Sequence, residues 1–172
     1  MSGAFSLARL RGASALAIAV LALVIISDHH APLVVFNASA SAPIGFYRVL
    51  RATQLQDGDL VLVRTPDAVR ELAAIRHYIP AGVPLVKRIA ARSGAEVCAI
   101  RGDITIDGRD VAEQRSTDRE GRKLPAWTGC HQLADNELFL LMEDVPDSFD
   151  SRYFGPVHVS DVIGRLVPLW LR

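Results

Sequence analysis

The sequence predicts a mainly β domain, a small barrel or coiled sheet with one short helix, behind an N-terminal transmembrane helix. Short runs rich in β-branched residues recur along the chain, turn signals such as Asp-Gly separate them, and one long apolar segment lies near the N-terminus. Half of the 172 residues are hydrophobic and 22% are charged, which excludes a disordered chain. The formal net charge is zero, so the chain lacks the electrostatic footprint of a nucleic-acid-binding protein.

The apolar segment GASALAIAVLALVIIS runs from Gly12 to Ser27 without a charged residue, and two arginines precede it. As a helix it would be about 24 Å long, shorter than the ~30 Å hydrocarbon core, and the arginines can extend toward the membrane interface. Its length fits either a retained signal anchor or a cleaved signal peptide. The nearest small-x-small cleavage site, Ala38-Ser39-Ala40, lies far from the segment, which favours the anchor.

The basic N-terminus should stay in the cytoplasm, which predicts a single-pass membrane protein whose remaining part is exported. Residues 1–11 would be cytoplasmic, residues 12–27 would span the membrane, and residues 28–172 would form the exported domain. Cys98 and Cys130 both lie in that exported part, where an oxidising compartment favours a disulfide bond between them. The alternative is that they are two unrelated buried thiols.

The first half of the exported part contains two strand signals. A short apolar stretch, PLVVF, leads away from the anchor, and the small and polar residues of NASASAPIGFY suit a turn. Strands are expected at Phe46–Leu50 and Leu60–Arg64, because both runs are rich in β-forming residues and an Asp57-Gly58 turn separates them.

A helix is expected from Pro66 to about Tyr78. Thr65 suits the N-cap and proline is favoured in the first helical turn, while Pro80 and Gly82 would end the helix. Apolar residues at helical spacing should face the core. These residues are Val69, Leu72, Ala73, Ile75 and Ile79.

The second half is predicted to be β-rich around one irregular segment. Asp107-Gly108 lies between two short β-rich runs and is a strong hairpin signal. Ala112–Leu133 is polar and contains glycine and proline, which is typical of irregular structure. Strands are expected at Pro84–Arg92, Val97–Ile100, Ile104–Ile106, Arg109–Val111, Glu137–Met142 and Val162–Trp170.

One lysine lies inside a predicted strand, in LVKRIAAR. Side chains alternate along a strand, so Lys87 should share a face with the apolar Leu85 and Ile89. Desolvation lowers the pKa of an ammonium group, and a lysine tuned in this way can serve as the general base for a serine nucleophile. The alternative is a surface lysine on an edge strand. No Ser-His-Asp arrangement stands out, and the five histidines have no metal-binding spacing.

Four segments, taken in order, resemble the type I signal peptidases (peptidase S26), and specifically the conjugative-transfer, TraF-like branch that processes pilins. DSRYFG within the last segment is the most specific match. The segments are NASASAPIGFY (Asn37–Tyr47), GDLV (Gly58–Val61), LVKRIA (Leu85–Ala90) and DSFDSRYFGP (Asp147–Pro156).

The resemblance implies a signal-peptidase-like coiled sheet and a role for each of five residues. Ser41 would be the nucleophile and Lys87 its general base. Ser39 would help to bind the oxyanion together with the backbone N–H of Ser41, Ser148 would hold Lys87 by a hydrogen bond, and Asp150 would orient the site.

The spacing around the expected nucleophile departs from the general enzymes. They have Ser-x-x-Pro, whereas Ser41 lies two residues before Pro43, and this leaves Ser39 as an alternative nucleophile. There is also no room for the large second domain that some general enzymes carry.

The resemblance implies a bacterial inner-membrane protein whose residues 28–172 form a periplasmic Ser-Lys peptidase domain. The leading hypothesis is a membrane-anchored serine endopeptidase that processes an exported pilin precursor for conjugative transfer. It would need no cofactor and no metal, and its partners would be the precursor, the inner membrane and other components of pilus assembly. Some members of the branch pass the acyl-enzyme to the pilin's own amino group, so linear and cyclic products both remain open. The alternatives are a general type I signal peptidase, a non-catalytic subunit of a secretion machine, and a repressor-type Ser-Lys autoprotease, which the anchor disfavours.

Overall fold

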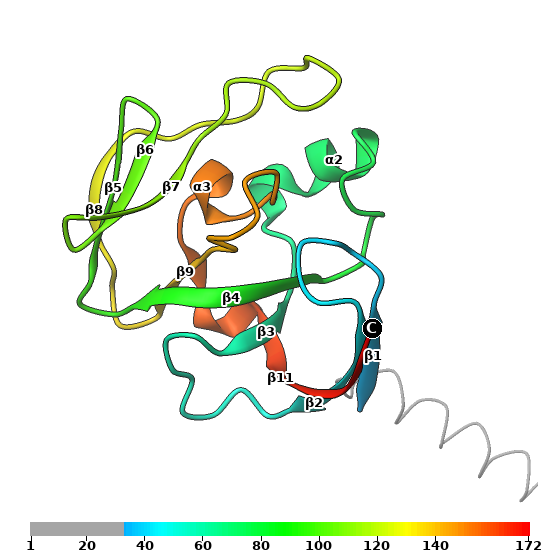
Figure 1. Cartoon of the computed structure of the whole chain (residues 1–172). Helices are drawn as coiled ribbons and strands as arrows, with labels where there is room; N and C mark the ends of the chain where they lie inside the picture. Colours follow the sequence, from blue (N-terminus) through cyan, green and yellow to red (C-terminus); the bar gives the residue numbers. More distant parts are fainter. Residues whose placement is uncertain (1–32) are drawn as a thin grey trace, which may run out of the picture. The chain divides into compact units, whose positions relative to one another are not determined.

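The computed structural model describes residues 33–172, so the predicted anchor at residues 12–27 lies outside the described part. Within residues 33–172, no helix has both the length and the apolar character needed to cross a membrane. This part of the chain is mainly β, as the sequence predicts, with two sheets and two short α-helices (Figure 1).

The larger sheet is antiparallel and has seven strands. Its last strand in the sequence lies between the second and third, so it joins the N-terminal hairpin to the rest of the sheet. In spatial order the strands are β1 (Val34–Asn37), β2 (Gly45–Leu50), β11 (Val162–Leu171), β3 (Leu60–Val63), β4 (Leu85–Arg92), β9 (Glu137–Leu140) and β10 (Val157–His158).

The smaller sheet has four antiparallel strands, in the spatial order β7 (Arg109–Glu113), β6 (Asp103–Ile106), β5 (Glu96–Ile100) and β8 (Gly129–Gln132). The predicted Asp-Gly hairpin is confirmed between β6 and β7. Asp107 and Gly108 both have positive φ, 49° and 76°, as a type I′ turn requires.

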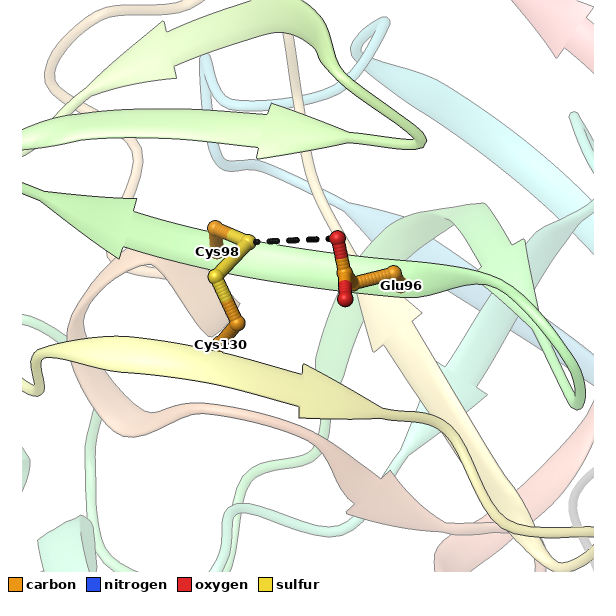
Figure 2. A group of neighbouring side chains, drawn as sticks. All are labelled: Glu96, Cys98 and Cys130. Carbon is orange, nitrogen blue, oxygen red and sulfur yellow. Dashed lines mark hydrogen bonds between the residues drawn. A yellow bond between two sulfur atoms is a disulfide. The ribbon is translucent and has the colours of Figure 1, made fainter.

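A disulfide bond joins Cys98 on β5 to Cys130 on β8, which confirms the predicted pairing (Figure 2). The two residues lie directly opposite each other in the sheet, and their Cα atoms are 4.0 Å apart. Glu96 Oε1 lies 3.7 Å from Cys98 Sγ, but a disulfide sulfur carries no proton and donates no hydrogen bond. Because both sulfurs are bonded to each other, this group of side chains offers no thiolate to a metal ion.

The predicted helix is present but shorter, and its capping is different. Helix α2 spans Asp67–Ile75 with Pro66 at the N-cap, and the Thr65 hydroxyl donates to the carbonyl of Val83 instead of capping the helix. The prediction for Ile75 was also wrong, because its side chain is 68% exposed. Ile75 is the last residue of α2 and lies about 1.7 turns after Val69, so it points away from the face that carries the buried Val69 and Ala73.

Two further elements depart from the prediction. Helix α3 (Ser151–Phe154) lies in a segment where no helix was expected, and Asp150 caps it by accepting a hydrogen bond from the backbone N–H of Arg152. Strand β8 lies in the segment that was expected to be irregular, and it forms by pairing with β5 next to the disulfide.

The core is formed by three groups of buried apolar side chains. One lies among β3, β4 and β9, a second packs the smaller sheet against β4 and β9, and a third lies beneath the loop between β1 and β2. This third group packs beneath the segment that carries the predicted nucleophile and supports it. It consists of Ala42, Tyr47, Val49, Leu60, Leu62, Met142 and Leu166.

Candidate active site

The loop between β1 and β2 carries Ser39 and Ser41. It is closed by the paired residues Asn37 and Gly45. A Cβ atom on Gly45 would collide with the carbonyl oxygen of Trp170 and would lie 2.9 Å from the Cα of Leu171, so only glycine allows β2 to approach β11 this closely. The glycine of the Pro-x-Gly-x-Tyr sequence therefore allows the end of this loop to pack directly against the last strand.

The two serine hydroxyls of this loop are in contact. Ser39 Oγ and Ser41 Oγ are 2.8 Å apart, and the backbone N–H of Ser41 donates to Ser39 Oγ at 3.2 Å. The Ser39 hydroxyl and the Ser41 N–H therefore lie beside the Ser41 side chain, where the resemblance places two donors for an oxyanion.

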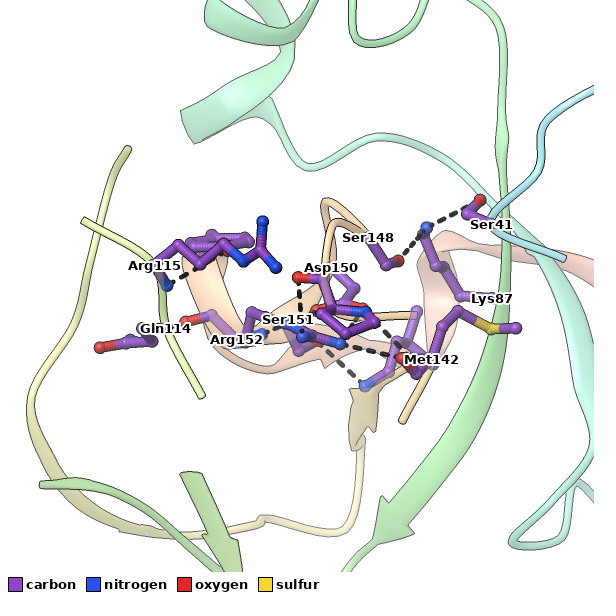
Figure 3. Close-up of polar contacts among 12 residues, drawn as sticks. Ser41, Lys87, Gln114, Arg115, Met142, Ser148, Asp150, Ser151 and Arg152 are labelled. Carbon is purple, nitrogen blue, oxygen red and sulfur yellow. Dashed lines mark hydrogen bonds and ion pairs between the residues drawn. The ribbon is translucent and has the colours of Figure 1, made fainter. Parts of the chain in front are cut away.

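Lys87 lies on β4 and shares a buried face with Leu85 and Ile89, as strand alternation predicts. Its side chain is only 2% exposed, which excludes the surface-lysine alternative. Lys87 Nζ donates hydrogen bonds to Ser148 Oγ at 2.8 Å and to Ser41 Oγ at 3.3 Å (Figure 3). Ser41 and Ser148, which are distant in the sequence, thus both contact the amine of Lys87.

Burial lowers the pKa of Lys87 to about 8, because desolvation disfavours the ammonium form. The positive charge of Arg152 lowers this pKa further, whereas the negative charge of Asp150 raises it. A substantial fraction of the amine is therefore neutral at mildly alkaline pH, and a neutral amine can accept a proton.

Asp150 is fully buried and does not contact Lys87 through a hydrogen bond. It forms an ion pair with Arg152, with Arg152 Nε 2.8 Å from Asp150 Oδ1, and it accepts a hydrogen bond from the backbone N–H of Met142 at 3.1 Å. Arg152 also donates to the carbonyl oxygens of Met142 at 2.9 Å and Pro146 at 3.2 Å. Together the pair fixes the connection between β9 and α3, on which Ser148 lies (Figure 3).

Sequence reasoning gave Arg152 no role, although it lies within the DSRYFG match. Its side chain is 1% exposed and donates to two backbone carbonyls as well as to the carboxylate of Asp150. The signal available in the sequence was an arginine two residues after an aspartate, because charged side chains that become buried are usually paired.

The segment before β8 supports the same connection from outside. Gln114 donates to the carbonyl of Arg152 at 2.6 Å, and Trp127 Nε1 donates to the carbonyl of Ser151 at 3.0 Å. Asp147, next to Ser148, forms ion pairs with Arg115 and Arg119. The loop that holds Lys87 in place is thus supported on both sides.

An open groove of about 680 Å³ runs past Ser41. Small and apolar side chains line it near the hydroxyl, and the charged Arg88, Glu143 and Asp144 also border it. The apolar lining includes Ala40, Ala42, Ala90, Leu141, Met142 and Val145.

Known proteins share this sequence over most of its length. The family described as "Signal peptidase, peptidase S26" matches residues 9–170. The conjugal transfer protein TraF of Agrobacterium fabrum is 34% identical over 144 residues, which cover 78% of this chain and 80% of that protein. A plasmid transfer protein TraF of Escherichia coli is 32% identical over 143 residues, covering 77% of this chain and 80% of the relative.

A crystal structure of a signal peptidase I from Enterococcus faecalis aligns with 67% of this chain and 98% of its own, with a TM-score of 0.40 and 20% identity. That similarity is too low to support an argument about the site. The family match and the identity to the TraF proteins are sufficient by themselves: the chain belongs to the signal peptidase family, peptidase S26, as a TraF-like member.

Proposed function

We propose that the protein is a membrane-anchored serine endopeptidase that uses Ser41 as nucleophile and Lys87 as general base. One observation carries the proposal: the buried amine of Lys87, with its lowered pKa, lies 3.3 Å from the Ser41 hydroxyl. No hydrogen bond joins Lys87 to Ser39 among the described residues, which favours Ser41 over Ser39 as the nucleophile.

In the proposed reaction, neutral Lys87 takes the proton from Ser41 Oγ as this oxygen attacks the scissile carbonyl carbon. The carbonyl oxygen becomes an oxyanion, which the Ser39 hydroxyl and the Ser41 N–H stabilise once they turn from each other toward the substrate. The protonated Lys87 then gives its proton to the departing amine, leaving an acyl-enzyme on Ser41. Water, deprotonated by Lys87, attacks the ester, and Lys87 then returns this proton to Ser41 Oγ as the new carboxyl end leaves.

Ser148 and Asp150 have supporting roles in this proposal. The 2.8 Å hydrogen bond from Lys87 to Ser148 holds the amine on the side that faces Ser41. Asp150 acts through Arg152 and the backbone to keep Ser148 in place, and it transfers no proton in this proposal, because its hydrogen bonds go to Met142 and Arg152 and not to Lys87 or Ser41.

The substrate we propose is an exported pilin precursor, cleaved after a small residue in an Ala-x-Ala-like context. Small and apolar side chains line the groove beside Ser41, which suits small substrate side chains. The relatives are named as conjugal and plasmid transfer proteins, which supports a role in conjugative transfer with other pilus-assembly components as partners. The acyl-enzyme could pass to water or to the precursor's own amino group, giving a linear or a cyclic product.

We further propose that the catalytic domain lies at the periplasmic face of the inner membrane. The Cys98–Cys130 disulfide suits an oxidising compartment. Three aromatic side chains on neighbouring strands are about half exposed, Phe36, Phe46 and Trp170, and their rings contact one another in series. An exposed aromatic row of this kind suits a lipid surface, and it begins shortly after the expected anchor in the sequence.

The test is processing of a precursor by single variants of the full-length chain. Ser41→Ala should abolish processing, because it removes the attacking oxygen. Ser39→Ala should slow it by about 10²–10³-fold, the cost of one oxyanion donor, and leave measurable activity. If Ser39→Ala is inactive and Ser41→Ala retains activity, the two serines have the opposite roles. Processing that survives Ser41→Ala would end the proposal.

A general type I signal peptidase is the second candidate, because the family match alone does not distinguish it. Rescue of a strain that lacks its own leader peptidase would favour that broader specificity. A non-catalytic subunit would have no need for the contact between Lys87 and Ser41.

A further inference from the structure

We propose that Asn37 is a positioning residue for the Ser41 loop, an inference that rests on the proposed function. Asn37 is the last residue of β1 and is 6% exposed. Its Nδ2 lies within hydrogen-bond distance of the carbonyl oxygens of Ser39 at 2.9 Å, Ala42 at 3.0 Å and Pro43 at 3.1 Å, so its two hydrogens are shared among three acceptors. Its Oδ1 accepts a hydrogen bond from the backbone N–H of Ser39 at 3.1 Å.

These contacts lie on both sides of the nucleophile. The backbone of Ser39 is held before Ser41, and the backbone of Ala42 and Pro43 is held after it. A single side chain therefore fixes the two ends of the short arc that presents the Ser41 hydroxyl. The Tyr47 hydroxyl adds a second donor to the Pro43 carbonyl, at 2.6 Å, but it does not reach the residues before Ser41.

The partners require an amide at this position. Three carbonyl oxygens converge on one end of the side chain and need N–H donors, while the Ser39 N–H at the other end needs an acceptor. Aspartate has the same shape and keeps the acceptor, but it places a carboxylate oxygen against the carbonyls. Alanine removes both kinds of contact. Asn37→Asp therefore tests the donating amide nitrogen alone, whereas Asn37→Ala tests the donor and the acceptor together.

The arc sets the distance over which the proposed proton transfer takes place. Ser41 Oγ lies 3.3 Å from Lys87 Nζ, already near the limit of a hydrogen bond, so a small displacement of the arc would separate the pair. A shift of about 1 Å in a reacting group can cost on the order of 10²-fold in rate. The amine itself is held by Ser148 on another loop, so its pKa should not depend on Asn37.

The experiment compares the full-length chain in detergent with Asn37→Ala, Asn37→Asp and Ser41→Ala, using an internally quenched peptide that contains an Ala-x-Ala sequence. Thr65→Val is the matched control, because Thr65 is also 6% exposed and donates to a backbone carbonyl, but lies at the start of α2. The readouts are kcat, KM, the acid limb of the pH–rate profile and Tm.

Asn37→Ala and Asn37→Asp should each lower kcat about 10²-fold. In Asn37→Ala, KM should change little and the acid limb should stay at the wild-type pH, because the amine is untouched. Thr65→Val should lower Tm and leave kcat unchanged. A kcat within twofold of wild type in both Asn37 variants, or a loss of kcat in Thr65→Val that matches theirs, overturns the positioning role. So does failure of both Asn37 variants to fold, because Asn37 is then a folding determinant.

The Ser41→Ala variant distinguishes failure of the positioning role from failure of the proposed function. If the wild type cleaves and Ser41→Ala does not, normal cleavage by the Asn37 variants overturns the positioning role alone. If Ser41→Ala cleaves as the wild type does, the proposed function fails, and the role of Asn37 fails with it.

Discussion

Replacing Lys87 by methionine should make the protein inactive and, near neutral pH, no less stable. Burial lowers the pKa of Lys87 from its ordinary 10.5 to about 8, so the folded protein binds this proton less tightly than the unfolded chain does. Each pH unit between the two values corresponds to about 1.4 kcal/mol, which makes the cost of the buried charge about 3 kcal/mol at pH 7. Methionine keeps the length of the side chain without the charge.

The substitution also removes a favourable contact. Ser148 is 2% exposed, and its hydroxyl would lose the hydrogen bond from Lys87. Leaving a buried hydroxyl without this partner costs about 1–3 kcal/mol, which offsets part or all of the gain. The net change in the free energy of unfolding at pH 7 is therefore expected to lie between about zero and +2 kcal/mol.

The pH dependence of the stability separates the effect of the buried Lys87 charge from the effect of the lost hydrogen bond to Ser148. Between pH 8 and pH 10.5 the unfolded wild-type chain keeps the proton that folded Lys87 has released, so the stability of the wild type rises with pH. The penalty is fully present below pH 8 and disappears above pH 10.5. Relative to Lys87→Met, the wild type should gain about 2 kcal/mol between pH 7 and pH 9.5.

Urea unfolding followed by tryptophan fluorescence measures this difference, because Trp127 packs against the buried Phe139. The two proteins are compared at both pH values with the disulfide intact, so other titrating groups contribute equally to both. A difference in stability that stays constant to within about 0.5 kcal/mol over this range would refute the buried, easily deprotonated amine. It would also mean that the pKa of Lys87 is not lowered, and without a lowered pKa the amine cannot serve as the general base.

Two further predictions concern the catalytic pair and its loop. The rate of peptide cleavage should rise with pH through an apparent pKa of about 8, since only the neutral amine of Lys87 accepts a proton; Lys87→Arg should be inactive at every pH. A profile that is flat from pH 6 to pH 9 would contradict this. Gly45→Ala should lower stability by about 1–3 kcal/mol and reduce cleavage, because the new methyl group meets the backbone of β11. Gly58→Ala is its control for urea unfolding, since Gly58 also has positive φ but has nothing within 4 Å of a Cβ, and equal losses would exclude the close contact as the cause.

The sequence was most informative where each strand has its own pattern. Every second side chain of strand β4 is buried, and this alternation predicted that Lys87 shares a face with Leu85 and Ile89, while the family resemblance decided between a buried and a surface lysine. Strand β8 has four exposed residues and no such pattern, so its pairing with β5 was not visible; Cys130 was the only local signal. Helix α3 is a four-residue turn, too short for helical periodicity to show.

The candidate site was predictable to the extent that its residues lie in recognisable motifs. Ser41, Lys87 and Ser148 were selected by resemblance, and the structure places them in contact. Asn37 and Arg152 lie in two of the same motifs, yet their functions depend on which backbone groups surround them after folding. The spacing of residues in the sequence does not show which backbone groups will surround a side chain. For Arg152, these groups are brought close only when the loop between β9 and α3 folds back on itself.

The placement of β11 decides when the proposed catalytic pair can come into existence during synthesis. Ser41 belongs to the β1–β2 hairpin and Lys87 to the β3–β4 pair, and in the larger sheet these two pieces are joined through β11, which ends at Leu171. Until that strand has left the ribosome, the hydroxyl and the amine belong to separate pieces with no shared ladder between them. Assembly must then wait for long-range pairing, which is slow. The proposed nucleophile and base therefore become part of one sheet only when the last strand is in place.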